Sequence, residues 1–224
     1  MKRRRYLVSL GAVAPLAGCA GYQGASTPTP DSTSIAEQGF PATVCEEPLL
    51  PELIRAIASP SFASGGELDP DERLVVVESG GVTRGYPRSI LRVHEAVNAP
   101  DGLLVTFCPL CNSGVVASRV VEGEEATFGV SGQLWKPPDA YTAARVADGD
   151  AFAVGEGDVR DTGNLVLYDL NTESRWSQLL ARAICGPLDG TRLDLHPSTV
   201  VTWAEWQAEY DGVVLQPPSE AELL

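Results

Sequence analysis

The stretch of sequence that organises the fold is Leu103-Leu-Val-Thr-Phe-Cys-Pro-Leu-Cys-Asn-Ser-Gly-Val-Val-Ala-Ser118. Its first residues are apolar or β-branched, which predicts a strand over 103–107. Asn112, Ser113 and Gly114 favour a turn, and a second β-branched run follows them. So short a connection predicts antiparallel pairing, because a parallel crossover needs a dozen residues or more. We therefore expect a pair of strands with Cys108 and Cys111 between them.

Similar runs elsewhere predict further strands, and fewer segments predict helices. Strands are expected over 74–78, 115–121 and 164–169. Helices are expected over 48–57 and 87–97, where apolar residues recur at helical spacing, and after Thr202, where Thr202-Trp203-Ala204-Glu205 is a capping-box pattern. The expected fold class is α+β, a mainly antiparallel β-sheet with a few short helices in a single domain.

The N-terminus has the pattern of an export signal. Lys2 and three arginines precede an apolar stretch over 6–17, which is too short to span a bilayer, since a spanning helix needs about 20 apolar residues. The order Arg3-Arg4-Arg5-Tyr6-Leu7 resembles a twin-arginine signal, which exports proteins already folded. Leu16-Ala17-Gly18-Cys19 is a lipobox, in which the thiol of Cys19 is the lipidation site. We expect a protein anchored by lipid to the outer face of the cell membrane.

The rest of the chain divides simply. Residues 1–18 are the expected signal peptide, and residues 19–38 are rich in Ser, Thr and Pro and are expected to form a tether. Residues 39–224 are long enough for one globular domain with a sizeable core.

Charge excludes one class of partner. The chain has 30 acidic and 16 basic residues, and four of the basic ones lie in the signal, so the mature part carries a formal charge of −18. Lys136 is its only lysine. An acidic, lysine-poor composition is favoured in high salt, which screens the repulsion between carboxylates. We expect a halophile, with an ordinary acidic protein as the alternative. Nucleic acid is disfavoured as a partner in both cases.

Chemistry is concentrated at Cys108-Pro109-Leu110-Cys111. Two thiols at this spacing can bind a metal or exchange with each other. A glutaredoxin-like dithiol opens a helix, whereas this motif leads into another strand, and that layout favours a metal-binding knuckle. A structural disulfide and inert thiols are the remaining alternatives.

A knuckle supplies two ligands, so further ligands must come from isolated residues. His94 precedes the strand that ends at Cys108 and is the expected third metal ligand, whereas His196 is expected to be an ordinary loop residue. Cys45 and Cys185 could form a disulfide or complete a four-cysteine site. Thiolate and imidazole ligands suit zinc or copper, and with an open coordination position Glu95 could act as a base.

Several long segments resemble domain-of-unknown-function family 3179, an uncharacterised family of exported proteins. The matching segments are 84–98, 105–114, 128–134, 164–169, 172–178 and 202–206. The resemblance implies a site that groups His94, Glu95, Cys108 and Cys111. It covers about residues 50–216 and implies no activity, because the family has none established.

The remaining residues of these segments favour packing over function. Tyr168, Trp176, Ser177 and Gln178 are expected to pack the sheet. Two departures from the family pattern are visible. Val93 replaces the usual tryptophan before the histidine, and residues 136–161 look like an inserted surface loop.

Three functions are therefore expected as alternatives. The first is a metal-binding lipoprotein with zinc or copper on Cys108, Cys111 and His94. The second is a thiol–disulfide oxidoreductase, in which Cys108 attacks and Cys111 resolves. The third is a non-catalytic binding module at the cell surface. Whether the protein is an enzyme stays open at the level of sequence.

Overall fold

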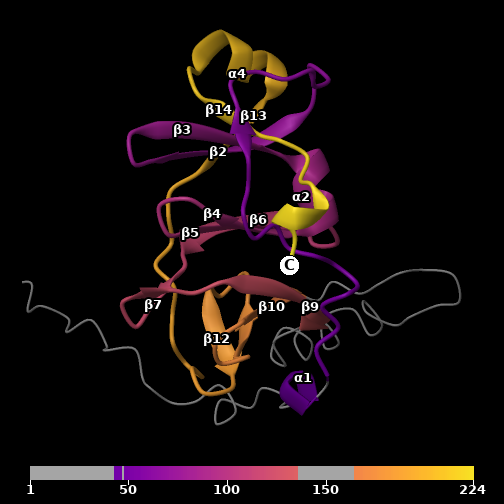
Figure 1. Ribbon diagram of the computed structural model, residues 1–224, viewed down its shortest axis with the longest axis vertical. Helices are drawn as coiled ribbons and strands as arrows, with labels where there is room; N and C mark the ends of the chain where they lie inside the picture. Colours follow the sequence, from indigo (N-terminus) through magenta and orange to yellow (C-terminus); the bar gives the residue numbers. More distant parts are fainter. Residues whose placement is uncertain (1–42, 47, 136–163) are drawn as a thin grey trace, which may run out of the picture. The chain divides into compact units, whose positions relative to one another are not determined.

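A computed structural model describes residues 43–46, 48–135 and 164–224 (Figure 1). All of them belong to one compact unit, Ser32–Leu224. The expected signal, the lipidation site Cys19, the tether and the inserted segment 136–161 lie outside the described residues, so these expectations stay predictions. No helix in the described ranges is long and apolar enough to cross a membrane.

The central sheet has three antiparallel strands in the order β4-β5-β6. Its strands are β4 (Ala96–Ala99), β5 (Leu103–Cys108) and β6 (Ser113–Ser118). Every residue of β5 is buried, and alternate side chains face opposite sides, as strand geometry requires. Cys108 pairs with Ser113 in the register, so residues 109–112 form the turn. The expected strand pair with two cysteines at its turn is confirmed.

A four-stranded antiparallel sheet covers one face of the central sheet. Its order is β12-β11-β10-β9, with β9 (Phe128–Trp135), β10 (Asn164–Asp169), β11 (Arg175–Ser177) and β12 (Arg182–Cys185). Leu104 and Cys108 of β5 pack in one apolar cluster with Phe128, Leu167 and Trp176 of this sheet. Its other face packs Val166 and Ile184 against Val44 of the short helix α1 (Thr43–Glu46).

A five-stranded sheet covers the opposite face. Its order is β1-β14-β3-β2-β13, with β1 (Phe62–Ala63), β2 (Arg73–Ser79), β3 (Val82–Pro87), β13 (Thr199–Thr202) and β14 (Val213–Leu215). Val105 and Phe107 of β5 pack against Val75, Val77 and Tyr86 of this sheet. Strands β14 and β3 run parallel, the one parallel pair between named strands in the described ranges.

Short elements complete the fold. They are α2 (Arg88–His94), α4 (Trp203–Glu209), the 3-10 helix η2 (Glu220–Glu222) and the hairpin β7 (Val120–Val121) with β8 (Glu124–Glu125). Helix α4 packs Trp203 and Trp206 on the outer face of the five-stranded sheet. The mainly antiparallel sheet architecture with short helices is as the sequence predicted.

The three helix predictions had different outcomes. The helix after Thr202 is confirmed, and both halves of its capping box are formed with Glu205. The helix over 87–97 exists but ends at His94, because Glu95 adopts a left-handed conformation at φ 57° and a strand follows. The prediction of a helix over 48–57 was wrong, since these residues form a turn and a bridge. Pro51 lies inside that segment and disfavours helical backbone at the residue before it.

Candidate functional site

Cys108 and Cys111 are joined by a disulfide at the turn between β5 and β6. The two cysteines differ in burial, because Cys108 is only 1% exposed and Cys111 is half-buried. The backbone N–H of Cys111 donates to Sγ of Cys108 at 3.3 Å. A backbone donor stabilises negative charge, so this geometry favours Cys108 as the sulfur that leaves as a thiolate.

The turn is held from the side of α2. Asn112 is in the left-handed region at φ 50°, and its Oδ1 accepts a hydrogen bond of 2.5 Å from Nη2 of Arg88. The guanidinium of Arg88 also lies over the ring of Phe107, 4.8 Å from its centroid. These contacts fix the conformation of the turn and bring a cation to it. Positive charge near a cysteine favours the thiolate form.

A buried polar network joins the same turn to the four-stranded sheet. Nε2 of Gln178 donates to Oγ1 of Thr106 at 3.2 Å and to the carbonyl of Ser113 at 3.1 Å. Oε1 of Gln178 accepts from Nδ2 of Asn164 at 3.1 Å, and Oδ1 of Asn164 accepts from Ser177 at 2.9 Å. Gln178 is 2% exposed. The network orients the disulfide-bearing turn, as buried satisfied networks do.

The aromatic residues of the 164–178 region are core residues. Trp176 is 1% exposed, lies edge-on to Phe128 at 5.4 Å, and donates from Nε1 to Oδ2 of Asp169 at 3.0 Å. Tyr168 is buried as well. Their places in the structure agree with the expectation that these residues pack the sheet.

His94 and Glu95 are neighbours in sequence with different surroundings. His94 is half-buried, and its Nδ1 hydrogen-bonds the carbonyl of Arg55 at 2.9 Å. Glu95 is 9% exposed and lines a cavity of about 130 Å³ together with Ile54, Leu110 and Gln133. Burial raises the pKa of the Glu95 carboxyl to about 7. A buried carboxyl at a left-handed residue is strained and costly, which is common at functional sites.

The cavity adjoins the disulfide. Ile54, Val130 and Leu165 line it, and all three also pack in the apolar cluster that contains Cys108 and Cys111. The structure thus places Glu95 and the cysteine pair in one region. His94 is not among the residues that line the cavity. Within 43–46, 48–135 and 164–224, no three or more His, Cys, Asp or Glu side chains are grouped so that they could hold a metal ion.

The other two candidate cysteines, Cys45 and Cys185, lie away from the disulfide turn, and only Cys185 has a described side chain. Cys185 is disulfide-bonded and packs against the cluster of Val44, Val166 and Ile184. The side chain of Cys45 lies outside the described residues, so its pairing with Cys185 stays a prediction. A four-cysteine metal site would need Cys185 as a free thiolate, whereas in this structure it is disulfide-bonded.

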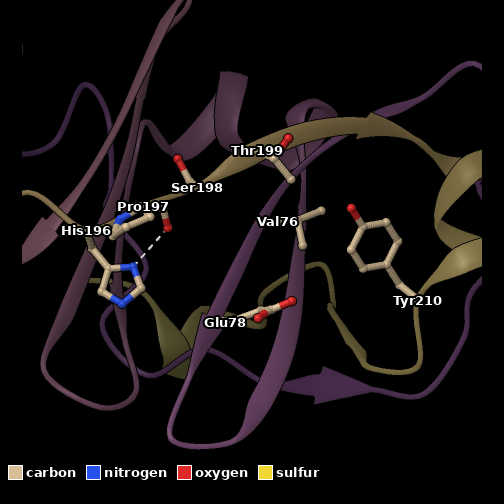
Figure 2. Close-up of a pocket in the computed structure, with 7 residues that line it drawn as sticks. All are labelled: Val76, Glu78, His196, Pro197, Ser198, Thr199 and Tyr210. Carbon is tan, nitrogen blue, oxygen red and sulfur yellow. Dashed lines mark hydrogen bonds between the residues drawn. The ribbon is translucent and has the colours of Figure 1, made fainter. Parts of the chain in front are cut away.

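His196 lies in a loop, as expected, at an open groove of about 510 Å³. Val76 and Glu78 of β2 form the middle of this groove, with His196 on one side and Tyr210 on the other (Figure 2). Nδ1 of His196 hydrogen-bonds the carbonyl of its neighbour Pro197 at 2.9 Å. Cys108 and Cys111 do not line this groove, which separates it from the disulfide site.

The comparison with protein families decides the classification. A family described as "Protein of unknown function (DUF3179)" matches residues 51–137 and 140–222. The chain belongs to the DUF3179 family. The DUF3179 match confirms the resemblance stated from the sequence, and it includes the disulfide turn, Glu95 and Gln133. No curated protein and no solved structure matches the chain.

Sequence reasoning missed Gln133 and the cavity. Gln133 falls inside the segment 128–134 that carries the DUF3179 resemblance, but a single glutamine in a strand gives no spacing signal. It is 7% exposed, and its Oε1 has no hydrogen-bond partner among the described residues. A buried amide oxygen without a partner is the signal that marks this residue, and it exists only in three dimensions.

The buried carboxyl of Glu95 predicts a pH effect on stability. Because the folded-state pKa of about 7 lies above the ordinary value of 4.5, the contribution of Glu95 to stability is present in full below about pH 4.5 and is lost as the pH rises through 7. The full loss is about 3 kcal/mol, from 1.36 kcal/mol per pKa unit. We expect Glu95→Gln to gain about this much stability relative to wild type between pH 4.5 and 7.5.

Urea denaturation at fixed salt would measure this difference. Glu124→Gln, at an exposed carboxylate, is the matched control and should follow wild type at every pH. Parallel stability curves for wild type and Glu95→Gln would show that burial does not hold the Glu95 carboxyl neutral.

Proposed function

We propose that this protein is an exported, lipid-anchored thiol–disulfide oxidoreductase, with Cys108 and Cys111 as its exchanging pair. The observation that carries the proposal is the disulfide at the turn, which joins a half-buried cysteine to a buried cysteine whose sulfur accepts a backbone N–H. An exchange site needs one sulfur that a partner can reach and one that leaves readily. The turn supplies both.

The proposed reaction oxidises a partner dithiol. A thiolate of the partner attacks Sγ of Cys111, the disulfide breaks, and Cys108 leaves as a thiolate with the electron pair. The partner's second thiolate then attacks the partner sulfur of this mixed disulfide and releases Cys111 as a thiolate. The partner gains a disulfide and the protein pair gains two electrons. A disulfide-bearing acceptor returns the pair to its starting state by the reverse steps.

These roles reverse the assignment expected from the sequence, in which Cys108 attacks. At 1% exposure Cys108 is out of reach of a protein partner, whereas Cys111 is half-buried. In the reduced state Cys111 is therefore the attacking thiol and Cys108 the resolving one. The hydrogen bond from the Cys111 N–H and the nearby guanidinium of Arg88 both favour the Cys108 thiolate.

Oxidation of a two-cysteine peptide tests the proposal. The processed protein, in detergent, is mixed with the reduced peptide, and the products are separated by mass after acid quenching. We expect one peptide disulfide to form for each Cys108–Cys111 pair that is reduced. A peptide that stays reduced while Cys108 and Cys111 stay bonded would rule the activity out.

Metal binding by the reduced pair is the second candidate. It is supported by the strand–turn–strand layout and by the amide that points at the Cys108 sulfur, because metal knuckles hold thiolates with turn amides. The bond from Nδ1 of His94 to the Arg55 carbonyl would orient its ring as a ligand. Reduced protein should then bind about one zinc or copper ion. His94→Ala should weaken metal binding, and His196→Ala should leave it unchanged.

Membrane attachment has a direct test. Because Cys19 is the residue that the lipobox would acylate, Cys19→Ser should move the protein from the membrane fraction to the soluble fraction. Fractionation of cells followed by immunoblotting would measure the change. Equal membrane retention of the variant and wild type would contradict a lipid anchor.

The acidic composition predicts a dependence on salt. With 12 basic against 30 acidic residues in the mature part, repulsion should fall as salt rises from about 0.15 M to about 1 M, where the Debye length shrinks from about 8 Å to about 3 Å. We expect the melting temperature to rise over this range. A melting temperature that is indifferent to salt, measured by circular dichroism, would argue for an ordinary acidic protein.

A further inference from the structure

The cavity beside the disulfide holds two buried polar side chains from different parts of the fold. Glu95 follows α2 and Gln133 lies on β9, and both are more than nine-tenths buried. Nε2 of Gln133 donates a hydrogen bond to the carbonyl of Pro48 at 3.3 Å, so the amide nitrogen already has a partner. Its oxygen, Oε1, has no partner among the described residues. The cavity therefore presents two kinds of hydrogen-bond acceptor, a carboxylate and an amide oxygen.

The rest of the lining is apolar. Ile54, Leu110, Val130 and Leu165 provide hydrocarbon walls. Leu110 is 56% exposed and lies between the two cysteines, so the cavity reaches the surface next to the disulfide turn. A volume of about 130 Å³ equals roughly four water molecules at about 30 Å³ each. A short hydrocarbon chain with a polar end fits that space.

The acceptors define the polar end. A buried carboxylate and an unpaired amide oxygen both cost free energy until a donor reaches them, and a positive charge removes the larger part of that cost. Arg55, which follows the lining residue Ile54, is directed elsewhere, since it donates to the carbonyl of Leu224 at 2.7 Å and pairs with Glu220. A ligand with several N–H donors and a positive charge satisfies both acceptors at once.

Other ligand classes fit less well. A divalent cation of the calcium type takes six to eight oxygen ligands, more than one carboxylate and one amide provide. Anions are repelled by the carboxylate and by the formal charge of −18 on the mature part. A quaternary ammonium ion carries the charge but has no N–H to donate. A primary ammonium has three donors.

We propose that this cavity binds a primary alkylammonium group, such as a lysine side chain. The hydrocarbon stem lies along Ile54, Leu110 and Leu165, as long basic side chains do on apolar surfaces. The ammonium donates to the Glu95 carboxylate and to Oε1 of Gln133. Amine binding at this site does not depend on disulfide exchange. A second consequence rests on the proposed function: the site would select thiol partners that carry a lysine near the reacting cysteine.

Titration with small amines tests the site without any redox step. Oxidised, processed protein in detergent is titrated with n-butylammonium by calorimetry at about pH 8.5, where the Glu95 carboxyl is ionised and the amine still protonated, and in molar salt. The comparison probes are n-butanol and tetramethylammonium. We expect saturable binding of butylammonium at one site, and binding at least tenfold weaker for both comparison probes. Equal binding of tetramethylammonium would show that surface charge alone attracts the amine. Equal binding of butanol would show that apolar contact alone is responsible. Binding that does not saturate would show that there is no defined site. Each of these results would overturn the proposal.

Variants locate the binding. Gln133→Leu and Glu95→Gln should each weaken the binding of butylammonium at least tenfold. Glu78→Gln, in the groove of Figure 2, should leave the affinity unchanged. Leu110→Trp fills the mouth of the cavity from an exposed position, so it should block binding without removing core contacts, even where Gln133→Leu fails to fold. Unchanged affinity in Leu110→Trp would place the bound amine elsewhere.

Discussion

Cys111→Ser and Cys108→Ser should both abolish oxidation of a peptide dithiol, and only Cys108→Ser should accumulate a mixed disulfide with oxidised glutathione. The reason is the difference in access to the two sulfurs. Cys108→Ser leaves the half-buried Cys111 thiol without its resolving partner, so the adduct is trapped. Cys111→Ser leaves the 1% exposed Cys108, which glutathione cannot reach. Mass spectrometry of intact protein after incubation would measure the adduct.

The matched control for this pair is Ser113→Ala, at the residue that pairs with Cys108 in the register. It removes a hydroxyl at the start of β6, next to the turn, and keeps both sulfurs, so it should retain dithiol oxidation. Adduct formation that is as fast in Cys111→Ser as in Cys108→Ser would contradict the assigned roles. Dithiol oxidation that survives in both variants would place the activity outside this pair.

Trp176→Ala should cause the largest loss of stability, about 4 kcal/mol, because a large buried side chain is removed from the core. Trp176 is 1% exposed and contacts Phe128, and its Nε1 donates to Asp169. Loss of that donor removes one of the hydrogen bonds to a carboxylate that is itself 1% exposed. Urea denaturation followed by circular dichroism would measure the free energy of unfolding.

Two further variants separate packing from hydrogen bonding. Trp176→Phe keeps an aromatic ring beside Phe128 but loses the N–H, so it should cost about 1–3 kcal/mol. Leu179→Ala, at a side chain that is 53% exposed, should stay within about 0.5 kcal/mol of wild type. A loss below about 1 kcal/mol for Trp176→Ala would mean that these sheets pack without this residue.

Much of the central sheet could be predicted from the sequence because its signals are local. The β-branched run before Cys108 and the turn residues after Cys111 predict the β5–β6 hairpin without reference to the rest of the chain. The Thr202 to Glu205 capping box is equally local. No helix forms over 48–57 because Pro51 disfavours helical backbone at the residue before it, and because the Leu50 N–H donates to the Ser131 carbonyl.

The candidate site could be predicted only in part because its second half is formed by distant strands. Oδ1 of Asn98 accepts from the backbone N–H of Phe128 at 2.7 Å, which sets β9 against β4 and brings Gln133 to Glu95. No spacing in the sequence encodes that register. The choice between thiols and a disulfide at Cys108 and Cys111 is likewise open at the level of sequence, since both forms share one motif.

The left-handed backbone of Glu95 was also invisible in the sequence. Glutamate seldom adopts positive φ, so a helix was expected to continue through it to Val97. Instead the helix ends, the chain turns, and Val97 lies in β4. The carboxyl of Glu95 is thereby directed to the cavity rather than along the outer face of a helix.

An equilibrium redox titration tests the central claim most directly. The processed protein is equilibrated across reduced and oxidised glutathione mixtures, quenched with acid, alkylated, and digested, and the state of Cys108 and Cys111 is read by mass spectrometry. A reversible two-electron transition is expected at a potential above about −300 mV, the range of labile and catalytic disulfides. A Cys108–Cys111 bond that stays closed down to about −300 mV and below would make it a structural disulfide and would contradict the proposed exchange.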